Sequence, residues 1–412
     1  MSKLPDTWQE VKLKDIATFS QGLQVAVEEQ VSTPIDNYVR FIRIVDYTQK
    51  NEDIRFVENK GQRYFASKSD IVMVRYGTPG LVGRGIEGII ANNLFKINLD
   101  QKIANNDFFE HLLKSSFVQN KLQSGSASTT MPAINFSTLN TVVIPLPPIE
   151  EQKKIADILS TVDKKIAFVE ENINATEELK KGLMQKLLTE GIGHTEFKDS
   201  ELGRIPESWE VIPFIELADK NIKHSFTGGP FGSDLKSEHY TDIGVRVIQL
   251  QNIGDGYFIN NDFVYVSEEK AELLKSCQIY PNDIILAKMA EPVARACLIP
   301  DFESKYVMCS DGIRLKVDNS KFNTEFIFYS INYDNFRKIA VARSNGTTRL
   351  RIGLSALKSI PILIPPLEEQ KQIAEILSTV DKKLENLKEK KQSFEELKKG
   401  LMQKLLTGEV RV

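Results

Sequence analysis

A glycine-rich stretch, YGTPGLVGRGIEG at residues 76–88, is the segment whose composition first indicates a ligand loop. It follows a β-branched, apolar run, and it lacks the G-x-x-x-x-G-K-[ST] pattern of a phosphate-binding loop. We therefore do not assign it to a nucleotide. Two interpretations stay open, a plain turn or a surface loop in which the backbone closely approaches a ligand.

The remaining reactive residue types form no catalytic constellation. The histidines His111, His194, His224 and His239 form no H-E-x-x-H and lie near no cysteine pair, so we predict no metal site. The segments LPPIEEQ and IPPLEEQ contain the two prolines of an adenine methyltransferase motif, but no Asn or Asp precedes those prolines. No D…E-x-K nuclease pattern stands out either. We predict that the chain has no catalytic residues and is not an enzyme.

Composition points to an ordinary globular protein of more than one domain. The chain has 412 residues, of which 41% are hydrophobic and 26% are charged. No apolar run approaches the ~18–20 residues of a membrane span, and the N-terminus has no apolar signal core. Cys277, Cys297 and Cys309 form no C-x-x-C, which favours reduced thiols. We expect a cytoplasmic protein.

The charge balance gives no basic domain. The formal net charge is −3, with 16 basic and 15 acidic residues in segment 1–145 and 20 and 23 in segment 192–363. Any contact with a polyanion must therefore use arginines and lysines placed on one face, or the help of a partner.

The chain contains a long internal repeat. Residues 147–189 align without a gap with residues 365–407, and 30 of 43 positions are identical. Both blocks end with EELKKGLMQKLLT. Each block opens with two prolines followed by two glutamates, which is typical of a helix start. The apolar positions then step by four and three, a heptad stripe that needs an apolar partner helix. In the second block Lys391 interrupts this stripe.

We predict that the two repeated segments pair as antiparallel coiled-coil helices of about 40 residues, or roughly 60 Å. The alternative is that each helix packs only on its own domain. Duplicated surface residues suggest two copies of one docking surface, formed by Lys180, Lys181, Leu183, Leu187, Lys398, Lys399, Leu401 and Leu405.

The segments before the helices also resemble each other. LPDTWQEVKLKDIA (4–17) is similar to IPESWEVIPFIELA (205–218), and SDIVMVRYG (69–77) to NDIILAKMA (282–290). Short β-branched runs and two aromatic-rich helical stretches predict a mixed α/β (α+β) class with a pseudo-two-fold repeat. The predicted segments are a domain over 1–146, a helix over 147–191, a domain over 192–364 and a helix over 365–412.

Taken together, these motifs resemble the specificity (S) subunit of type I restriction–modification systems over essentially the whole chain. The resemblance rests on Pro5/Trp8 and Pro206/Trp209, on GGPFGSDLKSEHY at 228–240, and on the repeated helix starts and ends. It implies two target-recognition domains that each read half of a bipartite DNA site. It also implies helices that dock two methyltransferase (M) subunits and set the unread spacer. The first half departs from the pattern, with FSQGLQVAVEEQ in place of FTGGPFGSDLKS.

The resemblance further places S-adenosylmethionine on the M subunits, and ATP with Mg²⁺ on restriction (R) subunits that join for cleavage. Arginine and lysine reach guanine edges, Asn and Gln reach adenine, and Ser or Thr contact bases or phosphates. On this basis the candidate DNA-binding residues are Arg40, Arg43, Arg75, Tyr76, Arg84, Thr129, Thr130, Arg246, Gln249, Lys288, Arg343, Asn345, Thr347, Thr348, Arg349 and Arg351. The rival hypothesis is a non-catalytic coiled-coil scaffold that binds only proteins.

Overall fold

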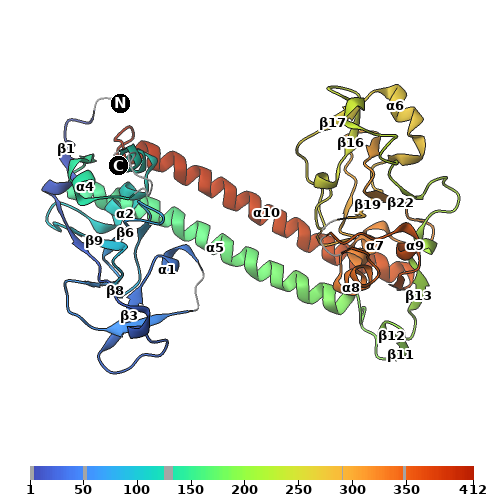
Figure 1. Cartoon of the computed structure of the whole chain (residues 1–412), viewed down its shortest axis with the longest axis horizontal. Helices are drawn as coiled ribbons and strands as arrows, with labels where there is room; N and C mark the ends of the chain where they lie inside the picture. The colour runs from blue at the N-terminus through green and yellow to red at the C-terminus, as the bar shows by residue number, and fades with distance from the viewer. Residues whose placement is uncertain (1–3, 50–52, 125–132, 290, 347–348) are drawn as a thin grey trace. The chain divides into compact units, whose positions relative to one another are not determined.

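A computed structural model of the chain describes residues 4–49, 53–124, 133–289, 291–346 and 349–412 (Figure 1). The chain forms two compact units, residues 1–171 with 388–412, and residues 172–387. The long helices α5 (Ile149–Leu187) and α10 (Leu367–Leu405) contribute to both units. Each unit therefore contains one mixed α/β domain, the start of one long helix and the end of the other.

The first unit contains two four-stranded sheets and one pair of strands. Their orders are β2-β9-β6-β7 and β4-β3-β8-β5, and β1 pairs with β10. The strands are β1 Gln9–Lys12, β2 Ala17–Gln21, β3 Tyr38–Ile42, β4 Arg55–Glu58, β5 Phe65–Ala66, β6 Ile71–Val74, β7 Val82–Gly83, β8 Gly88–Ile90, β9 Leu94–Leu99 and β10 Val143–Leu146. The short helices are α1 Val45–Thr48, α2 Asn106–Lys114, α3 Ser116–Ser124 and α4 Phe136–Thr141.

The second unit repeats this plan with additions. Its sheets are β14-β22-β19-β20 and β15-β17-β16-β21-β18, β13 pairs with β23, and β11 and β12 form a hairpin. The strands are β11 Phe197–Ser200, β12 Gly203–Pro206, β13 Glu210–Pro213, β14 Phe226–Gly228, β15 Tyr240–Thr241, β16 Val245–Ile248, β17 Val264–Val266, β18 Gln278–Ile279, β19 Ile284–Ala287, β20 Ala296–Leu298, β21 Tyr306–Met308, β22 Gly312–Leu315 and β23 Pro361–Ile364. The short helices are α6 Glu268–Leu273, α7 Thr324–Ile331, α8 Asp334–Ala342 and α9 Leu354–Lys358.

The two sheet plans match strand for strand. The ladders are antiparallel except for one parallel pair in each unit, β3 with β8 and β16 with β21. The hairpin and the edge strand β15 are the additions of the second unit. This correspondence confirms the predicted mixed fold and its internal repeat.

A buried glutamine anchors the start of each long helix in its own domain. The side-chain oxygen of Gln152 accepts a 2.8 Å hydrogen bond from the Asn105 N–H, and its amide donates to the Pro147 carbonyl at 2.9 Å. Gln370 accepts in the same way from the Asn323 N–H at 2.8 Å. Asn105 and Asn323 cap α2 and α7, so one amide connects the long helix to the cap of a short helix. Buried amides need such partners, which explains why both blocks contain EEQ.

A tryptophan–glutamate contact lies beside each of these glutamines. The indole N–H of Trp8 donates to Glu151 at 3.2 Å, and that of Trp209 donates to Glu369 at 3.0 Å. Both indoles are buried, at 5% and 0% exposure. The repeated P-x-x-W and E-E-Q motifs are therefore two sides of one contact between domain and helix.

The two carboxylates differ in their further partners. Arg411 donates to both oxygens of Glu151, at 2.9 and 2.7 Å. Glu369 instead lies 2.8 Å from the His194 ring nitrogen and accepts the Ile192 N–H at 2.9 Å. The segment that follows one long helix thus returns to the start of the other in each unit.

The heptad stripe is buried along both long helices, and its first members lie in the domain cores, Ile155 and Leu159 in the first unit and Ile373 and Leu377 in the second. Its members below 10% exposure are Ile155, Leu159, Val162, Val169, Ile173, Ile373, Leu377 and Leu384. In the first unit, Lys398 pairs with Asp163 at 2.5 Å and Lys391 with Glu170 at 3.3 Å. The residue numbers rise along one helix as they fall along the other, so the pairing is antiparallel. The lysine that interrupts the stripe is accommodated by an ion pair.

The last turns of α5 and α10 show that the docking prediction is wrong for two of its leucines. Leu187 is 6% exposed in the core of the second unit, and Leu405 is 2% exposed in the core of the first. Lys180 is held by Asp381 at 2.6 Å. The apolar positions at the end of EELKKGLMQKLLT therefore pack on a domain in both copies, and Leu187 and Leu405 are no docking surface. No helix in the described part of the chain is apolar over a length that could cross a membrane.

The Arg411–Glu151 contact predicts a pH-dependent stability. The hydrogen bonds from Arg411 lower the pKa of the Glu151 carboxyl, against the opposing effect of burial. A carboxyl whose pKa is lowered by folding stabilises the fold above its unfolded pKa, near 4.3, and this contribution is lost as the pH falls through the folded pKa. Arg411→Ala should therefore lower the unfolding midpoint at about pH 7, and this effect should fade as the pH falls from about 4 through the lowered folded pKa of Glu151.

Thermal unfolding of the full chain across this pH range, followed by near-UV circular dichroism, measures the effect. Lys404→Ala removes an exposed cation from the last turn of α10 and is the matched control. An Arg411→Ala effect of equal size at both ends of the pH range would contradict the assignment.

Candidate nucleic-acid interface

The central strands β6 and β19, one in each unit, end in the same arrangement of backbone hydrogen bonds, which we call the backbone frame. In the second unit, the Lys288 N–H donates to the Asp311 carbonyl at 2.7 Å, and the Lys288 carbonyl accepts the Ile352 N–H at 3.0 Å. In the first unit, Arg75 makes the equivalent bonds to Asn93 and Ile134, at 2.8 and 2.9 Å. In both units the residue after this strand is thus a cation, and its backbone is hydrogen-bonded to a turn on one side and to a returning loop on the other. This supports the predicted alignment of Lys288 with Arg75.

In the second unit the returning loop carries most of the predicted residues. Asn345 and Arg351 exchange two backbone hydrogen bonds of 2.9 Å, which closes a short loop. Gly346 has φ 110°, and a Cβ there would lie 2.4 Å from the Arg349 carbonyl, so the closure requires glycine. Arg349 is exposed at this loop, while Thr347 and Thr348 lie outside the described residues.

Two of the arginines around this loop have intrachain partners. Arg351 pairs with Asp311 at 2.6 Å while its side chain stays 51% exposed. Arg343 donates to the Ser359 hydroxyl at 2.8 Å. Exposed pairs of this kind are weak, so Arg351 can exchange its carboxylate for a phosphate at little cost.

The loop of the first unit is less cationic. Arg75 donates to the Asn135 side chain at 3.3 Å, and Tyr76 forms a bridge with Ala133. Thr129 and Thr130 lie outside the described residues. Arg75 is therefore the predicted cation that remains at this strand end.

Three further predicted arginines of the first unit are engaged in ion pairs. Arg40 pairs with Asp46 at 2.8 Å, and Arg43 lies between Asp46 and Asp53. Arg84 contacts Asp107 and lies 3.2 Å from Glu110. The glycine-rich segment around Arg84 does have G-x-G-x-x-G spacing, at Gly83, Gly85 and Gly88. It joins β7 to β8, however, so no helix N-terminus follows it to hold a phosphate, and it is a loop between strands.

Arg246 corrects the prediction for strand β16. It is 5% exposed and lies 3.5 Å from the Phe263 ring centroid, with Nη1 donating to Asn260 at 3.0 Å. Burial lowers the pKa of its guanidinium. Asp46, which pairs with Arg40 in the first unit, corresponds to Asn252 in the second. The guanidinium of Arg246 therefore lies against an aromatic ring and not beside the equivalent carboxylate. Gln249, just after the strand, accepts a 3.2 Å bond from Gln251 and remains at the surface.

Sequence reasoning missed a hollow of the first unit that combines polar and apolar side chains. It has a volume of about 440 Å³, its polar lining residues are Gln24, Gln30, Arg43, Asn92 and Asn93, and the rest of its lining is apolar. Amides and guanidinium groups are the types that read base edges. These residues belong to separate loops and form no motif, so only the fold brings them together.

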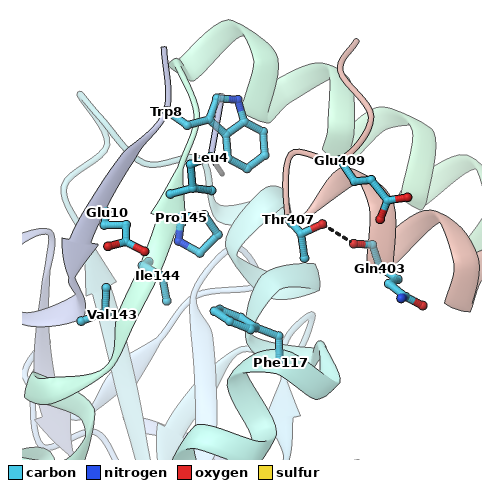
Figure 2. A pocket seen from close by; sticks show the side chains of 10 residues that line it. All are labelled: Leu4, Trp8, Glu10, Phe117, Val143, Ile144, Pro145, Gln403, Thr407 and Glu409. Atoms are coloured by element: carbon cyan, nitrogen blue, oxygen red, sulfur yellow. Dashed lines mark hydrogen bonds between the residues drawn. The ribbon is translucent and has the colours of Figure 1, made fainter. Parts of the chain in front are cut away.

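A second hollow in the first unit has the opposite character (Figure 2). It measures about 670 Å³ and lies between Trp8, the β1–β10 pair and the end of α10, where Gln403 and Thr407 line it. Its charged lining residues are Glu10 and Glu409, which a polyanion would avoid. In the second unit the corresponding region is divided in two. The part next to β23 has about 30 Å³ and is lined by Leu202 of the β11–β12 hairpin, and the part next to Trp209 and Val211 has about 540 Å³. We therefore exclude this hollow from the nucleic-acid interface.

The family of this chain is evident from comparison with known proteins. The model of the type I restriction modification DNA specificity domain matches residues 5–178 and again residues 234–396. These matches cover most of the chain, which therefore belongs to the family of type I restriction–modification DNA specificity proteins.

Individual relatives agree with this family. The type I restriction enzyme MjaVIII specificity subunit of Methanocaldococcus jannaschii is 28% identical and aligns over 100% of this chain and 94% of its own length. The EcoKI specificity subunit of Escherichia coli K12 is 21% identical, over 90% of this chain and 81% of its own. A crystal structure of the type I restriction–modification S subunit from M. genitalium has the same fold, with TM-score 0.62 and 17% identity over 98% of this chain and 97% of that one. The resemblance stated from the sequence is thus confirmed.

The exposed arginines of the second unit yield a salt-dependence prediction. Arg349→Ala and Arg351→Ala should each weaken DNA binding by the assembled complex. Loss of a phosphate contact reduces the salt slope of binding by about 1, whereas loss of a base contact costs ~1–3 kcal/mol at one position of the site. Titration of DNA binding at several salt concentrations distinguishes the two.

The control is Arg204→Ala, which removes an exposed arginine from the β11–β12 hairpin. If Arg349→Ala and Arg351→Ala bind like the control at every salt concentration, the loop lies outside the interface.

Proposed function

We propose that this chain selects the DNA sites of a type I restriction–modification complex, with each unit reading one half of a bipartite site. One observation carries the proposal. Both units have the same backbone frame, yet they present different side chains at equivalent positions, such as Arg75 and Lys288, or Asn93 and Asp311. A repeated frame with different reading groups fits two different half-sites.

Direct readout needs side chains that DNA can reach. In the second unit we propose Lys288, Arg349 and Arg351, of which Arg351 is paired with Asp311, and in the first unit Arg75 together with the amides that line the hollow. Guanidinium groups bind guanine and amides bind adenine, so the two halves would differ in base preference. Most of the affinity would still come from phosphate contacts.

The proposed partners are two M subunits, which supply S-adenosylmethionine and methylate adenine, and R subunits, which supply ATP- and Mg²⁺-dependent cleavage. We propose no cofactor for this chain, whose sequence contains no adenine methyltransferase motif. The M subunits would bind the exposed faces of the long helices, which include Lys181 and Lys399. The helices would also set the unread spacer. We place this function in the cytoplasm, where DNA and S-adenosylmethionine would both be available.

Exchange of one recognition domain tests the proposed division of labour. Replacing residues 202–360 with those of a relative should change one half-site of the methylated sequence and leave the other half intact. Methylome sequencing of a host that carries the chimaera measures this. A change in both half-sites would contradict the modular arrangement, and sequence-independent DNA binding with M subunits present would support a protein-binding scaffold instead.

Charge reversal on the helix ends tests the docking of two M subunits. Lys181→Glu and Lys399→Glu should each reduce the assembly from two M subunits to one, and the double variant should bind none. Native mass spectrometry at saturating M subunit gives the stoichiometry. Lys220→Glu, an exposed lysine of the second domain, is the control and should retain both. A one-to-one complex with the unchanged chain would refute the proposed stoichiometry.

A further inference from the structure

Phe231 is a phenylalanine displayed at the surface of the second unit. It is 83% exposed, and it belongs to GGPFGSD, the segment that follows β14. Burying a ring of this size would contribute roughly 1.5–3 kcal/mol. A single exposed apolar side chain is ordinary on a protein surface, so it is the position of Phe231 in the fold that indicates a function.

The loop holds this ring in a defined place. The Gly229 N–H donates to the Gly312 carbonyl at 2.8 Å, and a Cβ on Gly229 would lie 1.7 Å from the Cys309 carbonyl oxygen. Pro230 is buried, and the Asp234 N–H closes a turn on the Phe231 carbonyl at 2.8 Å. Phe231 is therefore exposed at a turn whose backbone is fixed on both sides.

The turn that anchors this loop is part of the candidate interface. Asp311 precedes Gly312, receives the Lys288 N–H on its carbonyl, and pairs with Arg351 through its carboxylate. The exposed ring thus belongs to the same corner of the fold as the cations at the strand end. An apolar ring next to cations fits the stacked bases of a duplex, whose phosphates the cations bind.

The first unit has the same loop without the ring. Gly22 corresponds to Gly229, and a Cβ there would lie 2.1 Å from the Ala91 carbonyl oxygen. Gln24 corresponds to Phe231, is exposed, and accepts a 3.2 Å hydrogen bond from Asn92. An amide can bind a base edge, but it cannot replace base stacking with an apolar surface.

We propose that Phe231 inserts between two base pairs of the half-site read by the second unit, and that Gln24 leaves the other half-site stacked. This inference rests on the proposed function, because it needs the loop to face DNA. It assigns the GGPFGSD segment a role in recognition through DNA deformation, so that easily unstacked steps such as TA or CA are preferred beneath the ring.

The test uses the full chain with its M subunits and duplexes that carry 2-aminopurine at successive positions of each half-site. The adenines that the M subunits would methylate are left unsubstituted, because base flipping by a methyltransferase also unstacks its target. At the remaining positions, fluorescence should rise on binding at one step of the second unit's half-site and at no step of the other. Phe231→Ala should abolish the rise and weaken binding by between about fivefold and about a hundredfold, the range for one stacked base. Phe231→Trp should retain both, and Phe302→Ala, which removes another exposed phenylalanine of the same unit, should change neither.

The outcomes separate this inference from the function beneath it. Specific binding by Phe231→Ala with unchanged affinity and an unchanged fluorescence rise would overturn the insertion and leave the proposed function standing. A fluorescence rise in both half-sites at positions other than the methylated adenines would overturn the asymmetry between Phe231 and Gln24. Failure of the unchanged complex to prefer any sequence would instead remove the proposed function itself.

Discussion

The arrangement of this protein depends on the anchorage of each long helix to the domain that precedes it. A buried glutamine and a glutamate at the helix start accept hydrogen bonds from the domain, at 2.8 Å from Asn105 and 3.2 Å from Trp8 in the first unit. Leaving such groups unpaired would cost about 1–3 kcal/mol each, so the first turn of the helix and the domain are expected to move as one body. The direction of each helix is thereby fixed relative to its recognition domain, as a protein that reads two half-sites requires.

The second constraint is the close approach of two loops in each domain. Gly22 and Gly229 lie where any side chain would overlap a carbonyl, so the residue-24 and residue-231 loops are held against the turn that also orients the strand-end cation. The backbone is common to both units while Gln24 and Phe231 differ. Specificity can then be changed at single side chains without a change of fold.

The balanced charge of the chain is explained by where its cations are used. Arg40, Arg43 and Arg84 are paired with carboxylates, and Arg246 is buried against an aromatic ring. These residues stabilise the recognition domains rather than attract a polyanion. The predicted cations left at the strand ends are few.

The sequence by itself determined the repeat, the two long helices, the mixed domains and the family, because all of these depend on local periodicity or on motifs that recur in order. That β6 and β19 are strands was predicted from their β-branched runs, but their pairing with neighbouring strands is seen only in the structure. What only the tertiary structure decided is which polar residues remain available. Arg84 finds Glu110 across 26 positions, Arg351 finds Asp311 across 40, and Arg411 finds Glu151 across 260. Ion pairs and burial depend on such distant contacts, which residue type and spacing do not encode. The sequence could therefore name the arginines as candidates but could not say which of them are available to bind DNA.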